Sequence, residues 1–141
     1  MKERLPQVLL KAVGVLNVAM ALAGAALAAF DLTTRSSLWQ KYPFAFPTML
    51  LCSLALLCAL VVSGILLIRG SEKAPRFGMS LYATEIVYFI VTALIPATAG
   101  AFAVANVALF PQLITAFPIW ALMAVWWCSR KPLKQEQAQG E

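Results

Sequence analysis

The sequence predicts an all-α integral membrane protein, a bundle of four transmembrane helices whose N- and C-termini both face the cytoplasm. Hydrophobic residues make up 62% of the 141-residue chain, whereas about 45–50% is usual for a soluble domain. Charged residues make up only 12%, about half of their usual share. A soluble fold of this size would leave much of that apolar surface facing water, so we expect the lipid bilayer to surround the chain.

The first helix is expected at residues 5–30, where one lysine, Lys11, is the only charge. As a helix this run would span about 39 Å, which exceeds a hydrocarbon core of about 30 Å. A cleaved signal peptide, with Ala26-Leu27-Ala28 as its cleavage site, is the alternative for this segment. The run is longer than the usual apolar region of a signal peptide, about 7–15 residues, and this favours the helix.

Three further helices are expected at about 47–68, 77–96 and 109–128. Residues 31–46 are polar and aromatic and are predicted to form an external loop. The run from Phe77 to Cys128 carries a single charge and is too long for one crossing, so the chain must turn back between Pro96 and Pro111. The connecting residues, 97–108, are unusually apolar and are expected to lie at the interface or to dip back into the bundle. Pro118 is predicted to kink the last helix.

Residues 1–128 are therefore expected to form one transmembrane domain. The tail, 129–141, lacks aromatic and β-branched residues and is predicted to be a disordered cytoplasmic segment. Nine Lys and Arg residues lie near one set of helix ends and two near the other, which predicts the orientation by the positive-inside rule. We expect a multi-pass protein of the cell (plasma or inner) membrane. Because the basic residues punctuate apolar runs instead of forming a patch, no nucleic-acid partner is expected.

Glu85 is the first candidate for a functional residue, because an ionisable group within the membrane is costly. The cost is about 2.5–3.5 kcal/mol for a charge at the centre of a helix, and such groups normally face the bundle interior. Lys11 and Glu85 are expected at comparable depths from the same membrane edge. We therefore predict that they form an ion pair, or else a site for a proton or a solute.

Tyr82, Tyr88 and Thr92 share an arc of about 120° with Glu85 on an α-helix. This polar stripe predicts an inward face, used either as a hydrated path for a proton or cation or as hydrogen bonds between helices. Asn17 is predicted to make polar contacts near the middle of the first helix. Small residues around it, including Gly24 and Ala28, predict close helix packing, either inside the bundle or against a partner.

No catalytic motif is present, and the absence of histidine removes the commonest general base and zinc ligand. We expect neither an enzyme nor a metal or other cofactor. Cys52, Cys58 and Cys128 are predicted to be inert apolar filler.

The sequence favours a non-catalytic accessory or assembly component that acts through helix contacts in the bilayer, with a membrane protein or a second copy as its partner. The alternative is a small homo-oligomeric transporter or channel, proton-coupled or cation-binding, that uses Glu85.

Overall fold

The computed structural model describes residues 4–34, 40–94 and 106–139, with side chains from Leu5 to Arg130 within those ranges. The described residues form helices and turns without any strand, which confirms the all-α class. The described helices are α1 Arg4–Thr34, α3 Ala45–Arg69, α4 Ala74–Leu94, the short 3-10 helix η1 Val107–Leu109, α6 Phe110–Ile114 and α7 Phe117–Gln139.

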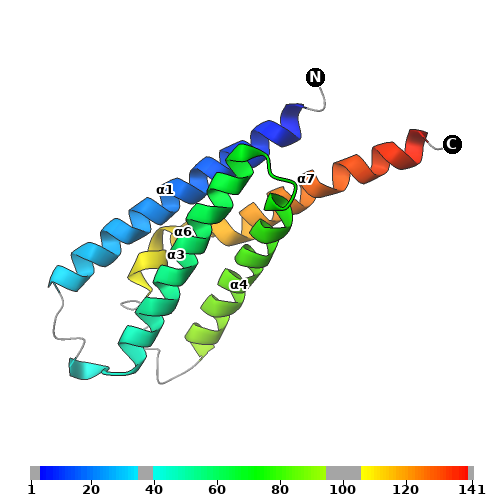
Figure 1. Ribbon diagram of the computed structural model, residues 1–141. Coiled ribbons are helices and arrows are strands. Elements are labelled where there is room, and N and C mark those ends of the chain that lie inside the picture. The colour runs from blue at the N-terminus through cyan, green and yellow to red at the C-terminus, as the bar shows by residue number, and fades with distance from the viewer. Residues whose placement is uncertain (1–3, 35–39, 95–105, 140–141) are drawn as a thin grey trace.

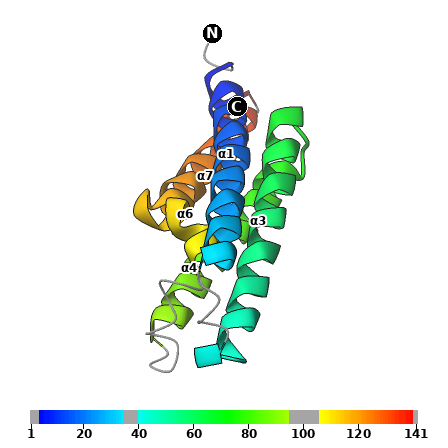
Figure 2. The same ribbon diagram turned by 90° about the vertical axis from the view of Figure 1, so that its left-hand side faces the viewer.

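The long helices form a closed ring (Figures 1 and 2). In this ring α1 contacts α3, α3 contacts α4, α4 contacts α7, and α7 returns to contact α1. The start of α1, the turn between α3 and α4, and the end of α7 lie toward the same end of the bundle. The short helices η1 and α6 pack against α1, so this part of the chain enters the bundle.

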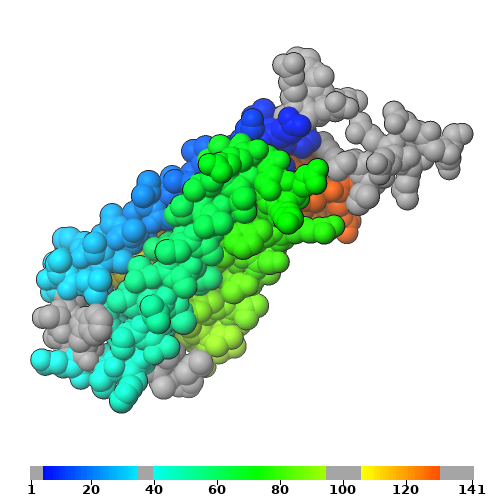
Figure 3. Space-filling view, viewed as in Figure 1, coloured from blue at the N-terminus to red at the C-terminus, as the bar shows by residue number. Residues whose placement is uncertain are grey.

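The most extensive contact joins α1 to α3, which lie side by side along the bundle (Figure 3). It depends on two glycines that face each other. A Cβ atom on Gly14 would lie 2.8 Å from the carbonyl oxygen of Gly64, and one on Gly64 would lie 2.7 Å from that of Gly14. The two backbones therefore touch, in the way that small residues allow in membrane helices.

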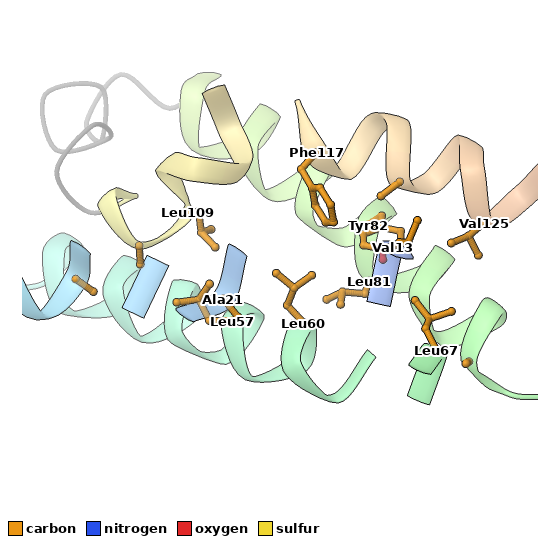
Figure 4. Packing of buried hydrophobic residues seen from close by; sticks show 14 residues of the cluster. Val13, Ala21, Leu57, Leu60, Leu67, Leu81, Tyr82, Leu109, Phe117 and Val125 are labelled. Atoms are coloured by element: carbon orange, nitrogen blue, oxygen red, sulfur yellow. The ribbon is translucent and has the colours of Figure 1, made fainter. Parts of the chain in front are cut away.

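The core is made of apolar side chains from every helix of the ring (Figure 4). Leu60 of α3, Leu109 of η1 and Val125 of α7 are among its fully buried members. The outer surface is also apolar, with exposed side chains such as Phe30, Leu51 and Met123. A molecule that is apolar both inside and outside suits a lipid environment.

Three of the described helices are long and apolar enough to cross a membrane, namely α1, α3 and α4. A fourth span is reached if the bent pair Val107–Ile114 and Phe117–Arg130 counts as one crossing. The sequence prediction of four transmembrane helices is thus supported in its coarser form, as three to four apolar helices long enough to cross a membrane.

The predicted helix at 109–128 is corrected by the structure, because this segment is broken. Its two halves meet at an angle of 59°, and Ala116 at the break has a positive φ of 49°. Pro118 explains the position of the break, since its ring would clash with the carbonyl group of Ile114, where α6 ends. The side-chain N–H of Trp120 donates to the Thr115 carbonyl at 3.1 Å and so satisfies a group freed by the break.

The other helix boundaries differ from the predicted ones by a few residues. Helix α1 continues to Thr34, into the segment predicted as a loop, and the hydroxyl groups of Thr33 and Thr34 bond back to the Phe30 carbonyl. Helix α4 begins three residues early, because Pro75 is tolerated in a first turn. Helix α7 runs to Gln139, through most of the tail predicted to be disordered, where lysine, glutamate, glutamine and alanine favour helix. Most of the predicted 97–108 connection lies outside the described residues.

Candidate functional site

The polar stripe predicted on the third helix faces the interior of the bundle. Tyr82, Glu85 and Thr92 of α4 are buried and Tyr88 is half-buried. Thr84 lies off the stripe and is exposed, and its hydroxyl donates to the Ser80 carbonyl at 2.8 Å, within the same helix. The buried polar residues of α4 thus share one side of the helix, whereas Thr84 lies on another side.

A chain of hydrogen bonds joins three helices at one level. The Tyr82 hydroxyl of α4 donates to Oδ1 of Asn17 in α1 at 2.9 Å. Asn17 in turn donates through Nδ2 to the Ser63 hydroxyl of α3 at 3.3 Å, and all three side chains are fully buried. Asn17 thus makes polar contacts with two neighbouring helices, α3 and α4.

Aromatic packing extends this level of the bundle to the fourth helix. The ring of Phe117, at the start of α7, meets the Tyr82 ring edge-on, with the centroids 6.0 Å apart (Figure 4). Phe117 also packs against Trp120, with the centroids 4.7 Å apart. Edge-to-face pairs add stability beyond their buried area. Tyr82 is thus fixed both through its hydroxyl and through its ring.

Tyr88 forms a second bridge, between α4 and α3. Its hydroxyl donates to the Met49 carbonyl at 3.2 Å and lies 3.3 Å from the Ser53 hydroxyl, which can donate to it. Two tyrosines on the face that carries Glu85 therefore contribute to helix packing. One lies a turn before Glu85 and the other a turn after it.

Glu85 differs from these neighbours. Its side chain is 0% exposed, yet neither carboxyl oxygen has a hydrogen-bond partner among the described residues. The amide groups of Asn106 and Gln112 also lack partners. These two side chains are 1% and 0% exposed, and none of their nitrogen or oxygen atoms has a hydrogen-bond partner in the described chain. Leaving a buried polar group unsatisfied costs about 1–3 kcal/mol, so three such residues in one small bundle call for a reason other than packing.

Asn106 and Gln112 were not among the site residues predicted from the sequence. They are buried because Asn106 directly precedes η1 and Gln112 belongs to α6, the two short helices that pack against α1. Amide side chains in a segment too apolar for an ordinary loop were the available signal. A return into the bundle was one of the two expectations for residues 97–108, but it did not single out these two amides.

The predicted ion pair between Lys11 and Glu85 is not formed in this structure. Lys11 is exposed and lines a pocket near the turn between α3 and α4, together with Glu72. Glu85 is enclosed by the bundle. The two residues have similar predicted depths, but they lie on helix faces that point in different directions. A role of either residue in binding a proton or a solute stays a prediction.

The chain's other reactive groups suggest no second centre. Cys52 and Cys58 are exposed on the apolar surface and Cys128 is buried. Within the described residues, no group of three or more His, Cys, Asp or Glu side chains is placed to hold a metal ion. No protein-family model matches the sequence, no curated protein matches it, and no solved structure matches its fold.

The Tyr82 hydrogen bond can be tested by stability. We expect Tyr82→Phe to lower the free energy of unfolding by about 0.6–2 kcal/mol, because the variant leaves Oδ1 of Asn17 without its donor. Circular dichroism during titration of the micellar protein with sodium dodecyl sulfate measures the change. The control is Tyr42→Phe, since the Tyr42 hydroxyl makes no hydrogen bond within the described residues. Equal shifts in the two variants would contradict the assignment.

Proposed function

We propose that this chain is a small polytopic membrane protein that binds a proton or a small cation at Glu85 and carries it across the bilayer, as a transporter or channel. In this proposal the bent pair of helices forms a fourth span. Both termini face the cytoplasm, in the cell membrane. The observation that carries the proposal is the fully buried carboxyl group of Glu85, which has no hydrogen-bond partner in the described chain.

The cost of this carboxyl group supports a functional role. Ionisable residues inside membrane helices are rare, face the bundle interior, and commonly mark pathways for protons or ions. If Glu85 served only to hold the helices together, it would bond to a neighbouring helix, as Tyr82 and Tyr88 do. Those two tyrosines already connect α4 to α1 and α3, so the bundle does not need Glu85 for that purpose.

The unpartnered amide groups indicate what kind of ligand the interior suits. The side chains of Glu85, Asn106 and Gln112 carry four buried oxygen atoms in all, each of which can accept a hydrogen bond or contact a cation. Oxygen atoms are also the ligands that hard cations prefer. No lysine or arginine pairs with Glu85 in the described chain, so its carboxyl group is available to a proton or to a positively charged ligand.

Proton movement through reconstituted vesicles tests the proposal. The purified protein is placed in liposomes that contain a pH-sensitive dye, and a potassium gradient with valinomycin supplies the driving potential. We expect inward proton flux well above that of protein-free vesicles. Glu85→Gln should reduce this flux by about tenfold or more, because an amide of nearly the same shape cannot release a proton.

Thr84→Val is the matched control for this experiment. Thr84 lies next to Glu85 but is exposed and bonds only within its own helix, so the isosteric change should leave the flux unchanged. Circular dichroism and vesicle incorporation must be equal for the three proteins. If Glu85→Gln is incorporated normally and retains the wild-type flux, the proposal fails. The same holds if the wild-type protein conducts no protons and no monovalent cations.

Assembly with another membrane protein is the second candidate, and one observation favours it. Four alanines of α1 are exposed along a single face, directed away from the buried face that carries Asn17. They are Ala12, Ala19, Ala23 and Ala26. Small residues let helices approach closely, so this face suits a helix of a partner or of a second copy. Loss of co-purification of two differently tagged copies in Ala19→Leu, with proton flux absent in the wild type, would favour this candidate.

A further inference from the structure

A pocket of about 350 Å³ lies at the end of the bundle where α1 begins and where α3 turns into α4. Its polar lining includes Lys11 of α1, Arg69 at the end of α3, and Glu72 in the turn. Leu10 and Leu67 are among the apolar residues on its wall. The pocket is separate from the interior face that carries Glu85, and nothing in the proposed transport function uses it.

The turn that closes this pocket is well defined. Gly70 ends α3 with a left-handed φ of 70°, a conformation that glycine adopts without strain. Its N–H donates to the Leu67 carbonyl at 3.2 Å, and the N–H of Ser71 donates to the Leu66 carbonyl at 3.1 Å. This cap fixes the direction in which the chain leaves Arg69, so the guanidinium group and Lys11 line one pocket.

The charges of the pocket favour an anion. Lys11 and Arg69 are both exposed and form no ion pair within the described part of the chain. They face one carboxylate, that of Glu72, so the lining carries one excess positive charge. Lys73 and Arg76 lie in and just after the same turn and raise the positive potential at this end of the bundle. A basic pocket between membrane helices is a typical setting for a lipid phosphate group.

The place of Lys11 on α1 indicates a lipid in preference to a free anion. Lys11 is seven residues from the start of α1, about 10 Å along the helix axis, within its apolar run. Val8 and Val15 share its outward face and are 62% and 57% exposed. A lysine surrounded by lipid-facing valines extends its ammonium group toward the headgroup layer. Acyl chains can then lie along the valines while the phosphate reaches the pocket.

We propose that this pocket binds the headgroup of an anionic phospholipid, with Lys11 and Arg69 contacting the phosphate oxygens. Titration of the full-length protein in detergent with phosphatidylglycerol, followed by native mass spectrometry, measures the binding. We expect one preferentially bound lipid per chain. Lys11→Gln and Arg69→Gln should each weaken binding by about fivefold, the usual effect of one cation near an anionic lipid surface. Lys11→Arg, which keeps the charge, should stay within about twofold of the wild type.

Two comparisons distinguish binding in the pocket from general electrostatic attraction between the lipid and the basic end of the bundle. A third comparison distinguishes a lipid phosphate from free phosphate. Lys73 belongs to the same turn but does not line the pocket, so Lys73→Gln should weaken binding far less than Lys11→Gln does. Phosphatidylcholine, which has no net charge, should bind more weakly than phosphatidylglycerol. Equal losses in the Lys73 and Lys11 variants, or equal binding of the two lipids, would overturn the proposal. Displacement of phosphatidylglycerol by millimolar inorganic phosphate would also overturn it, in favour of a free-anion site.

Discussion

Gly24→Ala is expected to destabilise the bundle by about 2–3 kcal/mol, even though alanine is the better helix former by about 1 kcal/mol. A Cβ atom on Gly24 would overlap the carbonyl oxygen of Ala108, and it would lie 3.1 Å from a methyl carbon of Leu57. The carbonyl group belongs to the backbone of η1, so no change of rotamer can move it away. The segment from Asn106 to Ile114 would have to shift away from α1. The free energy of unfolding, measured by titration with sodium dodecyl sulfate, reports the loss.

The control for this prediction is Ala25→Val. Ala25 is the next residue of the same helix, but it is exposed, so added volume meets no part of the bundle. We expect its unfolding midpoint to stay close to that of the wild type. A Gly24→Ala protein as stable as the wild type would show that the short helices do not pack on α1 as described. Because α6 carries Gln112, the same result would also contradict the burial of Gln112 in the proposed site.

The three long helices could be predicted because each is specified locally. An apolar run of sufficient length, ended by a charge or by a glycine and proline turn, indicates a membrane helix without knowledge of the rest of the fold. The inward face of α4 could also be predicted from the sequence, since the positions of Tyr82, Glu85 and Thr92 follow from the period of the helix. Such features depend only on residues that are close in the sequence.

The ion pair predicted between Lys11 and Glu85 is not formed, because it depends on how two helices are oriented relative to each other. The sequence places both residues at a similar depth, but it does not determine how α1 is rotated about its axis. The structure turns α1 so that Asn17 and Gly24 face the interior, and Lys11 then lies outside the buried face. The rotation is set by tertiary contacts, above all by the close approach of Gly14 to Gly64.

The break in the fourth helix and the burial of Asn106 and Gln112 are tertiary features of the same kind. Pro118 predicted a distortion, but its size depends on the packing of α6 and α7 against α1 and α4. Periodicity cannot detect a segment that enters the bundle and bends, because its short helices are too brief to show a period. The burial of Asn106 and Gln112 therefore could not be predicted from the sequence, whereas that of Glu85 could.

Gln112→Met is expected to make the protein more stable and less active. Gln112 is 0% exposed, and neither its side-chain nitrogen nor its oxygen has a partner among the described residues. Methionine has a similar length and volume and removes both unsatisfied atoms. Relief of this cost should raise the free energy of unfolding by about 1–3 kcal/mol. If Gln112 contributes to the proposed path, proton flux in the vesicle assay should fall together with this gain.

The opposite signs of the two effects make this variant informative. Sites that bind polar ligands commonly retain groups that the folded chain alone leaves unsatisfied, so stability is lost where function is gained. Gln40→Met is the control, because Gln40 is exposed and the same change of side chain there should alter neither quantity. Higher stability with unchanged flux would exclude Gln112 from the path, while Glu85 could still belong to it. Lower stability would instead show that the amide is satisfied within the protein, and the argument from unpartnered polar groups would then fail for this residue.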